Sequence, residues 1–453
     1  MSTKPLKRST IYTYGLLGVP LAMFGYPIGI WLPTFYAGEL GISLGAVAGM
    51  LFMARFVDVV TDPLTGFASD HLKGRWGRRK PFLAVGLPVI MLGVAMVFMP
   101  RFFAGDGMVP SYLFLAITVM YLGITLVFVP YGAWGAELSG VYHERSRITA
   151  AREGFVLIGL LVAAAVPFAL ELVGQRGLVP IMDAMAWSIL IVLPLCGLLV
   201  LWRVPEPKDV PVRKTKFMVG LKALISNKPM FYILLIAMIV TGGESFRNAL
   251  SLFFMRDYMG SPSIGIPYLF YFAAGLVAIP GWLIAGRKFG KHRAFAVCLM
   301  TVAVISTMMY FLNHGDLIAF YVLFILKGAC FGGLQFLPMA MLADVVDVDT
   351  SKTGSSRAGV YFAISGSAVK ISAMFGTTTA LAILGAIQFN PGGADVVNTS
   401  EALQGLAFNY VIVPAVFFLG ALFLTWTFPL TEEIQKHLRD KIEADLHGTD
   451  PID

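Results

Sequence analysis

Charged residues are scarce in this sequence. Only 34 lysines and arginines and 27 aspartates and glutamates occur among its 453 residues, which makes 13% of the chain charged. An ordinary soluble domain carries about 25%. Hydrophobic residues make up 57% of the chain, and the mean hydropathy is +0.76. A soluble globule needs a more charged surface and a disordered chain needs a more polar composition, so both classes are excluded.

Cysteine and histidine are also rare. The three cysteines, Cys196, Cys298 and Cys330, lie scattered in apolar stretches. Such a set forms neither a disulfide framework nor a metal site, and we interpret the thiols as small packing residues. The six histidines do not cluster, and the sequence contains no HExxH motif and no phosphate-binding loop. We therefore expect no enzymatic activity, no cofactor and no resident metal.

Long apolar segments recur along the whole chain. A helix needs about 20 apolar residues to cross a bilayer, so this pattern predicts an all-α membrane protein with twelve transmembrane helices. Proline or glycine interrupts nearly every segment, which membrane helices tolerate. The first segment is too long for the core of a signal peptide and is expected to be an uncleaved span. The segments lie at about 11–37, 42–69, 81–100, 111–138, 149–171, 178–202, 229–255, 263–286, 293–313, 316–343, 355–388 and 405–429.

Basic residues gather in every second loop. They occur in the N-terminal tail, in HLKGRWGRRK at 71–80, in the loop at 203–228, in GRKFGKHR at 286–293 and in the C-terminal tail. Loops rich in lysine and arginine stay in the cytoplasm, so we expect both termini on the cytoplasmic face of the inner membrane. The net charge of +7 is then a signal of topology, and no nucleic-acid partner is expected.

The basic loop at 203–228 divides the chain into two halves of similar pattern. VPYGAWGAEL in the first half resembles LPMAMLADVV in the second, and GFASDHLKGRWGRR parallels GWLIAGRKFGKHR. Such repeats are typical of secondary transporters with a midplane cavity. We expect pseudo-symmetric six-helix bundles at 1–202 and 229–430, a cytoplasmic linker at 203–228 and a cytoplasmic tail at 431–453. Two bundles complete a pathway without a partner chain, so a monomer is expected.

The second apolar segment contains residues that a bilayer penalises. Arg55, Asp58 and Asp62 in ARFVDVVTDPLTG lie on one helix face, and each costs about 2.5–3.5 kcal/mol at the centre of a spanning helix. Two carboxylates one turn apart can ligate a small cation or share a proton. Arg55 would compensate one negative charge in the empty site. An Arg–Asp pair that only joins helices would leave one carboxylate unexplained, so we predict a cation site.

A basic turn follows this segment. Gly66, Asp70 and Gly74 recur at four-residue intervals, and Arg75 comes next. The pattern resembles the cytoplasmic loop motif of the major facilitator superfamily. In that motif the glycines permit close helix approach, and Asp70 would pair with basic groups of neighbouring helices to hold one conformation.

Further motifs narrow the resemblance. RFVDVVTDPLTGFASD, RWGRRKPF, VPYGAWGAELS, ERSRITAAREGF and MLADVVD resemble the signatures of the glycoside–pentoside–hexuronide:cation symporters, which include the melibiose permease and the eukaryotic lysolipid transporters. The motifs occur in matching order in both halves. The resemblance implies a major facilitator fold and symport of a small organic substrate, a sugar or glycoside, with a monovalent cation (Na⁺, Li⁺ or H⁺) by alternating access.

The resemblance also implies site residues. Asp58 and Asp62 match the two aspartates that bind the cation, and Thr125 falls where a threonine of the fourth helix joins them. Lys370 in SGSAVKISAMFG matches a lysine of the eleventh helix near the site. Arg152 matches an arginine of the substrate cavity, with an offset of one residue.

Two departures leave the substrate open. The melibiose permease binds its sugar through acids of the first and fourth spans, and the corresponding positions here are Ala22 and Phe128. Either other groups bind a polyol, or the substrate is less polar than a sugar. The alternative function is therefore a symporter or exporter of an amphipathic, lysolipid-like substrate. Uniport, a receptor or scaffold role and a membrane-embedded enzyme are further alternatives, and the last lacks any matching motif.

Other polar residues within the apolar segments are candidate substrate contacts. For Glu244 and Arg247 the simpler alternative is an internal ion pair. The rings of Trp134 and Tyr131 could stack on a sugar, or they could have packing or interface roles. The candidates are Glu244, Arg247, Asn248, Lys327, Gln335 and Trp134.

A last group of charged residues lies near the cytoplasmic helix ends of both halves. We predict that they form gating ion pairs across the bundle interface, with a static role at helix termini as the alternative. With Asp70 and Arg75, the predicted gating residues are Glu137, Arg147, Asp344, Asp347 and Arg357.

Overall fold

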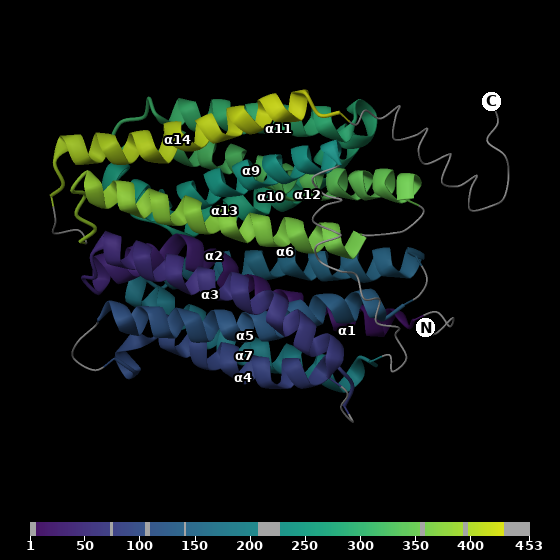
Figure 1. Cartoon of the computed structure of the whole chain (residues 1–453). Helices are drawn as coiled ribbons and strands as arrows, with labels where there is room; N and C mark the ends of the chain where they lie inside the picture. The colour runs from purple at the N-terminus through teal and green to yellow at the C-terminus, as the bar shows by residue number, and fades with distance from the viewer. Residues whose placement is uncertain are drawn as a thin grey trace.

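The computed structural model describes residues 6–72, 76–104, 109–139, 142–206, 227–353, 358–392 and 397–429. Long helices make up almost all of this part of the chain (Figure 1). Twelve of its segments are long and apolar enough to cross a membrane, as the sequence predicts. The first of them, Arg8–Glu39, combines three pieces, and the seventh, Lys228–Tyr258, combines two.

The helices of the first half precede residue 206. They are α1 (Arg8–Leu16), α2 (Gly18–Thr34), η1 (Phe35–Glu39), α3 (Leu44–His71), α4 (Lys80–Phe98), η2 (Pro100–Phe102), α5 (Pro110–Glu137), α6 (Tyr142–Leu172) and α7 (Leu178–Arg203). The helices of the second half are α9 (Lys228–Phe253), η3 (Phe254–Tyr258), α10 (Gly265–Phe289), α11 (Lys291–Met309), α12 (Leu317–Thr353), α13 (Ala358–Ala386) and α14 (Ser400–Trp426).

Two helices extend by about two turns or more beyond their apolar segments. Helix α6 begins at Tyr142 and α12 continues to Thr353, whereas hydropathy alone predicts segments at 149–171 and 316–343. The added turns contain polar residues such as Glu144 and Arg147. These residues leave the apolar window but are good helix formers, so the helix continues beyond the expected bilayer core.

The two halves form two bundles that lie side by side, with the earlier helices in the lower part of Figure 1 and the later ones in the upper part. Most contacts occur within a half. Among the described residues, the main helix pairs between the halves are α3 with α13, α6 with α10, and α2 with α9. A two-fold pseudo-symmetry between the halves relates α3 to α10 and α6 to α13, so it maps the first of these pairs onto the second.

Equivalent local features support this symmetry. The first long span of each half ends in a π-helical turn, η1 in one and η3 in the other. A glycine with positive φ follows each turn, Gly41 at 70° and Gly260 at 69°. A serine then precedes the next helix, and the hydroxyl oxygens of Ser43 and Ser263 accept hydrogen bonds from the backbone N–H groups of Ala46 and Ile266. Serine is a preferred residue for this capping role.

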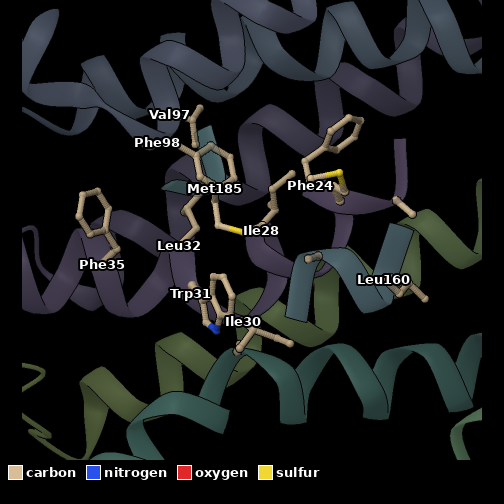
Figure 2. Packing of buried hydrophobic residues seen from close by; sticks show 14 of the residues in the cluster. Phe24, Ile28, Ile30, Trp31, Leu32, Phe35, Val97, Phe98, Leu160 and Met185 are labelled. Carbon is tan, nitrogen blue, oxygen red and sulfur yellow. The ribbon is translucent and has the colours of Figure 1, made fainter. Parts of the chain in front are cut away.

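Helix α2 lies at the centre of the molecule and is apolar on every side. Figure 2 shows Ile28 and Leu32 on the side of Met185 and Phe98, while Trp31 points away from them. All five side chains are buried. A helix that is apolar all round is expected where both sides pack against protein, and α2 contacts α6 and α7 as well as α9.

The helix ends define two faces of the protein. We call the face where α1 begins and α14 ends the terminal side, which is on the right in Figure 1, and the opposite face the far side. On the far side the bundles are in close contact. A Cβ atom at Gly265 would lie 2.4 Å from the backbone nitrogen of Phe168, and one at Gly385 would lie 3.7 Å from Leu44 Cβ. Glycine at position 265 therefore permits this approach of α10 to α6.

Candidate functional site

Three oxygen-bearing side chains converge between α3 and α5. The hydroxyl oxygen of Thr125 lies 2.7 Å from Asp58 Oδ1 and 2.9 Å from Asp62 Oδ1. Thr125 is fully buried and Asp58 is 1% exposed. The i, i+4 spacing of the two aspartates places them one helical turn apart on one face. A hydroxyl group carries one proton, so it cannot donate a full hydrogen bond to both carboxylates. The three oxygens together form a partial cage for a small cation or a shared proton.

A lysine from the other half of the chain completes the cluster. The Nζ atom of Lys370, on α13, lies 2.5 Å from Asp62 Oδ2 and 3.1 Å from Asp58 Oδ2. Its side chain is 26% exposed. The sequence resemblance predicts a lysine near this site, and the structure places its ammonium group between the two carboxylates. The contact also links the two bundles, because α3 and α13 belong to different halves.

Arg55 provides a second positive charge. Its Nη1 atom lies 3.2 Å from Asp58 Oδ2, and its guanidinium carbon lies 4.2 Å from the ring centre of Tyr121, a cation–π contact. Sequence reasoning missed Tyr121, because an aromatic residue in an apolar span gives no distinguishing signal. The cluster thus contains two carboxylates and two basic groups, so its formal charges balance.

A cavity of about 1260 Å³ lies between the two bundles. Arg55 and Tyr121 form part of its wall, which connects it to the carboxylate cluster. Its lining on α6 begins at Thr149, and on α12 it continues to Ala343. Both residues lie toward the terminal side and are exposed, whereas the far side is closed by the glycine contacts. The cavity therefore reaches the surface on the terminal side.

Three of the predicted substrate contacts line this cavity, namely Arg152, Asn248 and Gln335. The guanidinium of Arg152 donates to Glu153 Oε1 at 2.7 Å, and Glu153 also lines the cavity. Sequence reasoning missed Glu153, although an acid beside a predicted cavity arginine was a usable signal. Ala22 lines the cavity too. This alanine stands where the melibiose permease has a sugar-binding acid, so that position does face the cavity here.

Three other predicted contacts lie behind the wall. Arg247 and Lys327 are each 1% exposed. Arg247 donates to Glu244 Oε2 at 2.8 Å and to Asn248 Oδ1 at 2.7 Å, and Lys327 donates to Ser306 at 2.7 Å. None of the three is among the residues that line the cavity in the described part of the chain. The structure thus supports the internal ion pair as the role of Glu244 and Arg247 in this conformation.

The prediction for Trp134 needs correction. The ring of Trp134 is fully buried, packs edge-on against Tyr14 and donates its N–H to the carbonyl oxygen of Pro205 at 3.1 Å. Tyr131 is 1% exposed and stacks on Tyr14 at 4.5 Å. Both rings are packing residues here. Phe128 is 54% exposed and also lies outside the cavity lining.

Two of the predicted gating residues, Asp70 and Glu137, form ion pairs within the first bundle. Glu137 accepts from Arg79 Nη2 at 2.6 Å, and Asp70 also binds Arg79 at 2.6 Å. All three residues belong to the first half. Burial alone lowers the pKa of Arg79, but hydrogen bonds and charges from Glu137 and Asp70 outweigh burial, so the pKa is raised above its ordinary value. The loop motif therefore ties α3, α4 and α5 together.

An ion pair within the second half involves a third predicted gating residue, Asp344. Asp344 binds Lys291 at 2.6 Å, and both residues belong to this half. Arg147 is exposed on α6 near the terminal side. Arg75 and Arg357 lie outside the described residues, as does the side chain of Asp347.

Metal clusters are not present in the described part of the chain, where no group of three or more histidine, cysteine, aspartate or glutamate residues could hold a metal ion.

Comparison with known proteins points to one family. The MFS/sugar transport protein family matches residues 13–432. The "Putative glycoside/cation symporter YagG" of Escherichia coli strain K12 is 24% identical over 411 residues, which cover 88% of this chain and 87% of that protein. The glucuronide carrier protein homolog of the same organism is 23% identical over 449 residues, which cover 96% and 95%. The crystal structure of the nucleoside transporter NupG matches with a TM-score of 0.62 at 12% identity, covering 93% of this chain and 98% of that chain. At that identity, the likeness shows the fold alone.

Proposed function

We infer the function of this chain from its family, because it belongs to the MFS/sugar transport family and within it to the glycoside–pentoside–hexuronide:cation symporters. On that premise we propose that it couples a monovalent cation to the transport of a sugar or glycoside by alternating access. Asp58, Asp62 and Thr125 bind the cation, which is Na⁺, Li⁺ or H⁺. The terminal side faces the cytoplasm of an inner-membrane protein, and a monomer is the working unit.

The observation that carries this proposal is the position of Lys370. Its ammonium group lies between two membrane-buried carboxylates that Thr125 also contacts. A cation with the same charge fits the same place, and the oxygen atoms of the cluster are the ligands that small cations prefer. Lys370 therefore acts as a built-in substitute for the transported cation.

Charge balance then explains coupling. With Arg55 and Lys370 in place, the two carboxylates are neutralised, and an added cation gives the cluster a net positive charge unless Lys370 withdraws. Because Lys370 comes from the second bundle, its withdrawal breaks a contact between the halves. Cation binding and bundle movement are thus linked, as coupling between two sites requires. The membrane potential adds about 2.3 kcal/mol per elementary charge per 100 mV.

The cavity supplies the substrate site. Arg152, Glu153, Asn248 and Gln335 offer charged and amide groups to a polyol, and Arg55 connects the cavity wall to the cation cluster. Substrate contacts on both bundles let one ligand favour closure around itself, which is the differential interaction that a conformational change requires.

An amphipathic substrate is the second candidate. The wall also contains many apolar side chains, among them Ile28, Leu51, Leu283 and Met339, and Ala22 replaces an acid expected for a sugar site. A lysolipid-like molecule would place its acyl chain along these residues and its head group beside Arg152 and Glu153.

A ligand screen of the purified protein separates these possibilities. Thermal unfolding is measured with neutral glycosides, uronides and lysolipids, each in sodium, lithium or choline buffer and at two pH values. We expect one sugar class to stabilise the protein, and more strongly with the coupling cation than with choline. Stabilisation by lysolipids alone would select the second candidate, and ligand effects that no cation or proton changes would overturn cation coupling.

A further inference from the structure

A carboxylate from one bundle caps a helix of the other on the far side. Glu171, in the last turn of α6, accepts three hydrogen bonds from the start of α10. Its Oε1 atom accepts from the backbone N–H groups of Ile264 and Gly265, both at 2.7 Å, and its Oε2 atom accepts from the hydroxyl of Ser263 at 2.6 Å. All three donors belong to the second half of the chain.

The carboxylate of Glu171 and the start of α10 stabilise each other electrostatically. The first N–H groups of a helix have no partner within the helix and carry a partial positive charge. A carboxylate there forms charge-assisted hydrogen bonds, which are about twice as strong as neutral ones. The donors are held in position, because Ser261 donates to the carbonyl oxygen of Ser263 at 2.7 Å and also contacts the hydroxyl of Tyr321.

The contact also lies at a place where the two bundles approach closely. Glu171 follows one turn after Pro167 and Phe168, whose backbones touch the Gly265 position. Separation of α6 from α10 would break all three hydrogen bonds at once. The symmetry-related start of α3 also has a serine cap, Ser43, but at α10 the hydroxyl of Ser263 donates in addition to the carboxylate of Glu171 from the other half.

We propose that Glu171 is a latch that holds the far side closed. Release of the latch precedes opening to the far side, and its re-formation favours the conformation described here, with the cavity open to the terminal side. This inference rests on the proposed alternating access. The latch is a hydrogen-bonded contact between the halves, separate from the Lys370 contact of the cation cluster, and it binds no cation.

Distance measurements between spin labels test the latch without a substrate. Labels are attached at cysteines introduced for Val173 and Ile318, which are 72% and 83% exposed and lie on the far side of opposite bundles. The natural cysteines are replaced by alanine. A second pair, at Leu72 and Phe289, reports on the terminal side, where both residues are exposed. Distances are recorded in nanodiscs for the parent protein and for Glu171→Ala, Glu171→Gln and Glu401→Ala.

We expect Glu171→Ala to raise the ratio of far-side-open to far-side-closed molecules at least about tenfold, since three hydrogen bonds to a charged group are lost. Glu171→Gln keeps an acceptor oxygen without the charge and should give a smaller shift. Glu401, an exposed acid in the first turn of α14 on the same side, is the matched control and should leave the distances unchanged.

An unchanged far-side distance in Glu171→Ala overturns the latch. If that variant does not fold, Glu171→Gln decides in the same way. The terminal-side pair separates the two proposals. A far-side distance that lengthens while the terminal-side distance stays constant supports the latch but contradicts alternating access.

Discussion

Lys370 of α13 and Asp62 of α3 form an ion pair, with Nζ and Oδ2 2.5 Å apart, that joins the two bundles beside the central cavity. The same ammonium group lies 3.1 Å from Asp58. The protein thus supplies a positive charge at the position proposed for the transported cation. Competition between the two charges follows from this geometry and can be measured.

Replacement of Lys370 should strengthen cation binding and abolish coupling. In Lys370→Met the side chain keeps its length but the competing charge is gone, so two carboxylates face only Arg55. We expect the cation affinity to rise at least about tenfold, which corresponds to about 1.4 kcal/mol, while gradient-driven accumulation is lost. Calorimetric titration with Na⁺ and Li⁺ checks this in detergent. Weaker cation binding than in the parent protein would show that Lys370 assists the cation instead of replacing it.

Neutralisation of either aspartate should have the opposite effect on binding. Asp58→Asn and Asp62→Asn each remove one negative ligand and leave Lys370 and Arg55 in excess. We expect cation-driven accumulation to vanish in proteoliposomes, with the protein still inserted and folded. Asp183→Asn, which changes an acid paired with Arg101 on the far side, is the control. Normal uphill transport by both site variants would disprove the site assignment.

The sequence predicts the fold well because its information is local. Apolar segments of bilayer length predict the twelve spans, and alternating basic loops predict the orientation of the chain across the membrane. The spacing of Asp58 and Asp62 places both on one helix face without any tertiary information. The helix extensions beyond the apolar windows are less visible, because hydropathy measures bilayer burial and not helix formation.

The partners of buried groups are harder to predict. Lys370 is distant from Asp62 in sequence, and only the family resemblance brings it to the site. Trp134 has an aromatic ring of the kind that can stack on a sugar, but in the structure the ring is buried and its N–H donates to the carbonyl oxygen of Pro205. Glu137 finds Arg79 within its own bundle, since charges at helix ends pair with the nearest opposite charge. Glu171 bonds mainly to backbone N–H groups, which have no sequence signature.

The hydroxyl of Thr125 is expected to matter more than the shape of its side chain. Thr125→Val keeps the volume but removes the oxygen that contacts both aspartates, while Thr125→Ser keeps the oxygen. Hydrogen bonds to charged groups contribute about 1.5–3 kcal/mol, so we expect valine to lower the cation affinity by about tenfold or more and serine to restore most of it. Equal affinities for the valine and serine variants would exclude Thr125 as a ligand.

The buried charges behind the cavity wall should control stability. Glu244 interacts with two basic groups, because it binds Arg247 directly and Lys327, which is also buried, acts on it electrostatically. Glu244→Gln leaves both cations without a counter-charge, and loss of one partner of a buried pair costs about 3–5 kcal/mol. We expect a clear fall in the thermal unfolding temperature, and a partial recovery in the double variant Glu244→Gln with Lys327→Met, which removes one of the two excess charges. Glu401→Gln, at an exposed position, should leave the unfolding temperature unchanged. If the double variant is no more stable than Glu244→Gln alone, Glu244 does not stabilise the charge of Lys327, and its only stabilising partner of the two is Arg247.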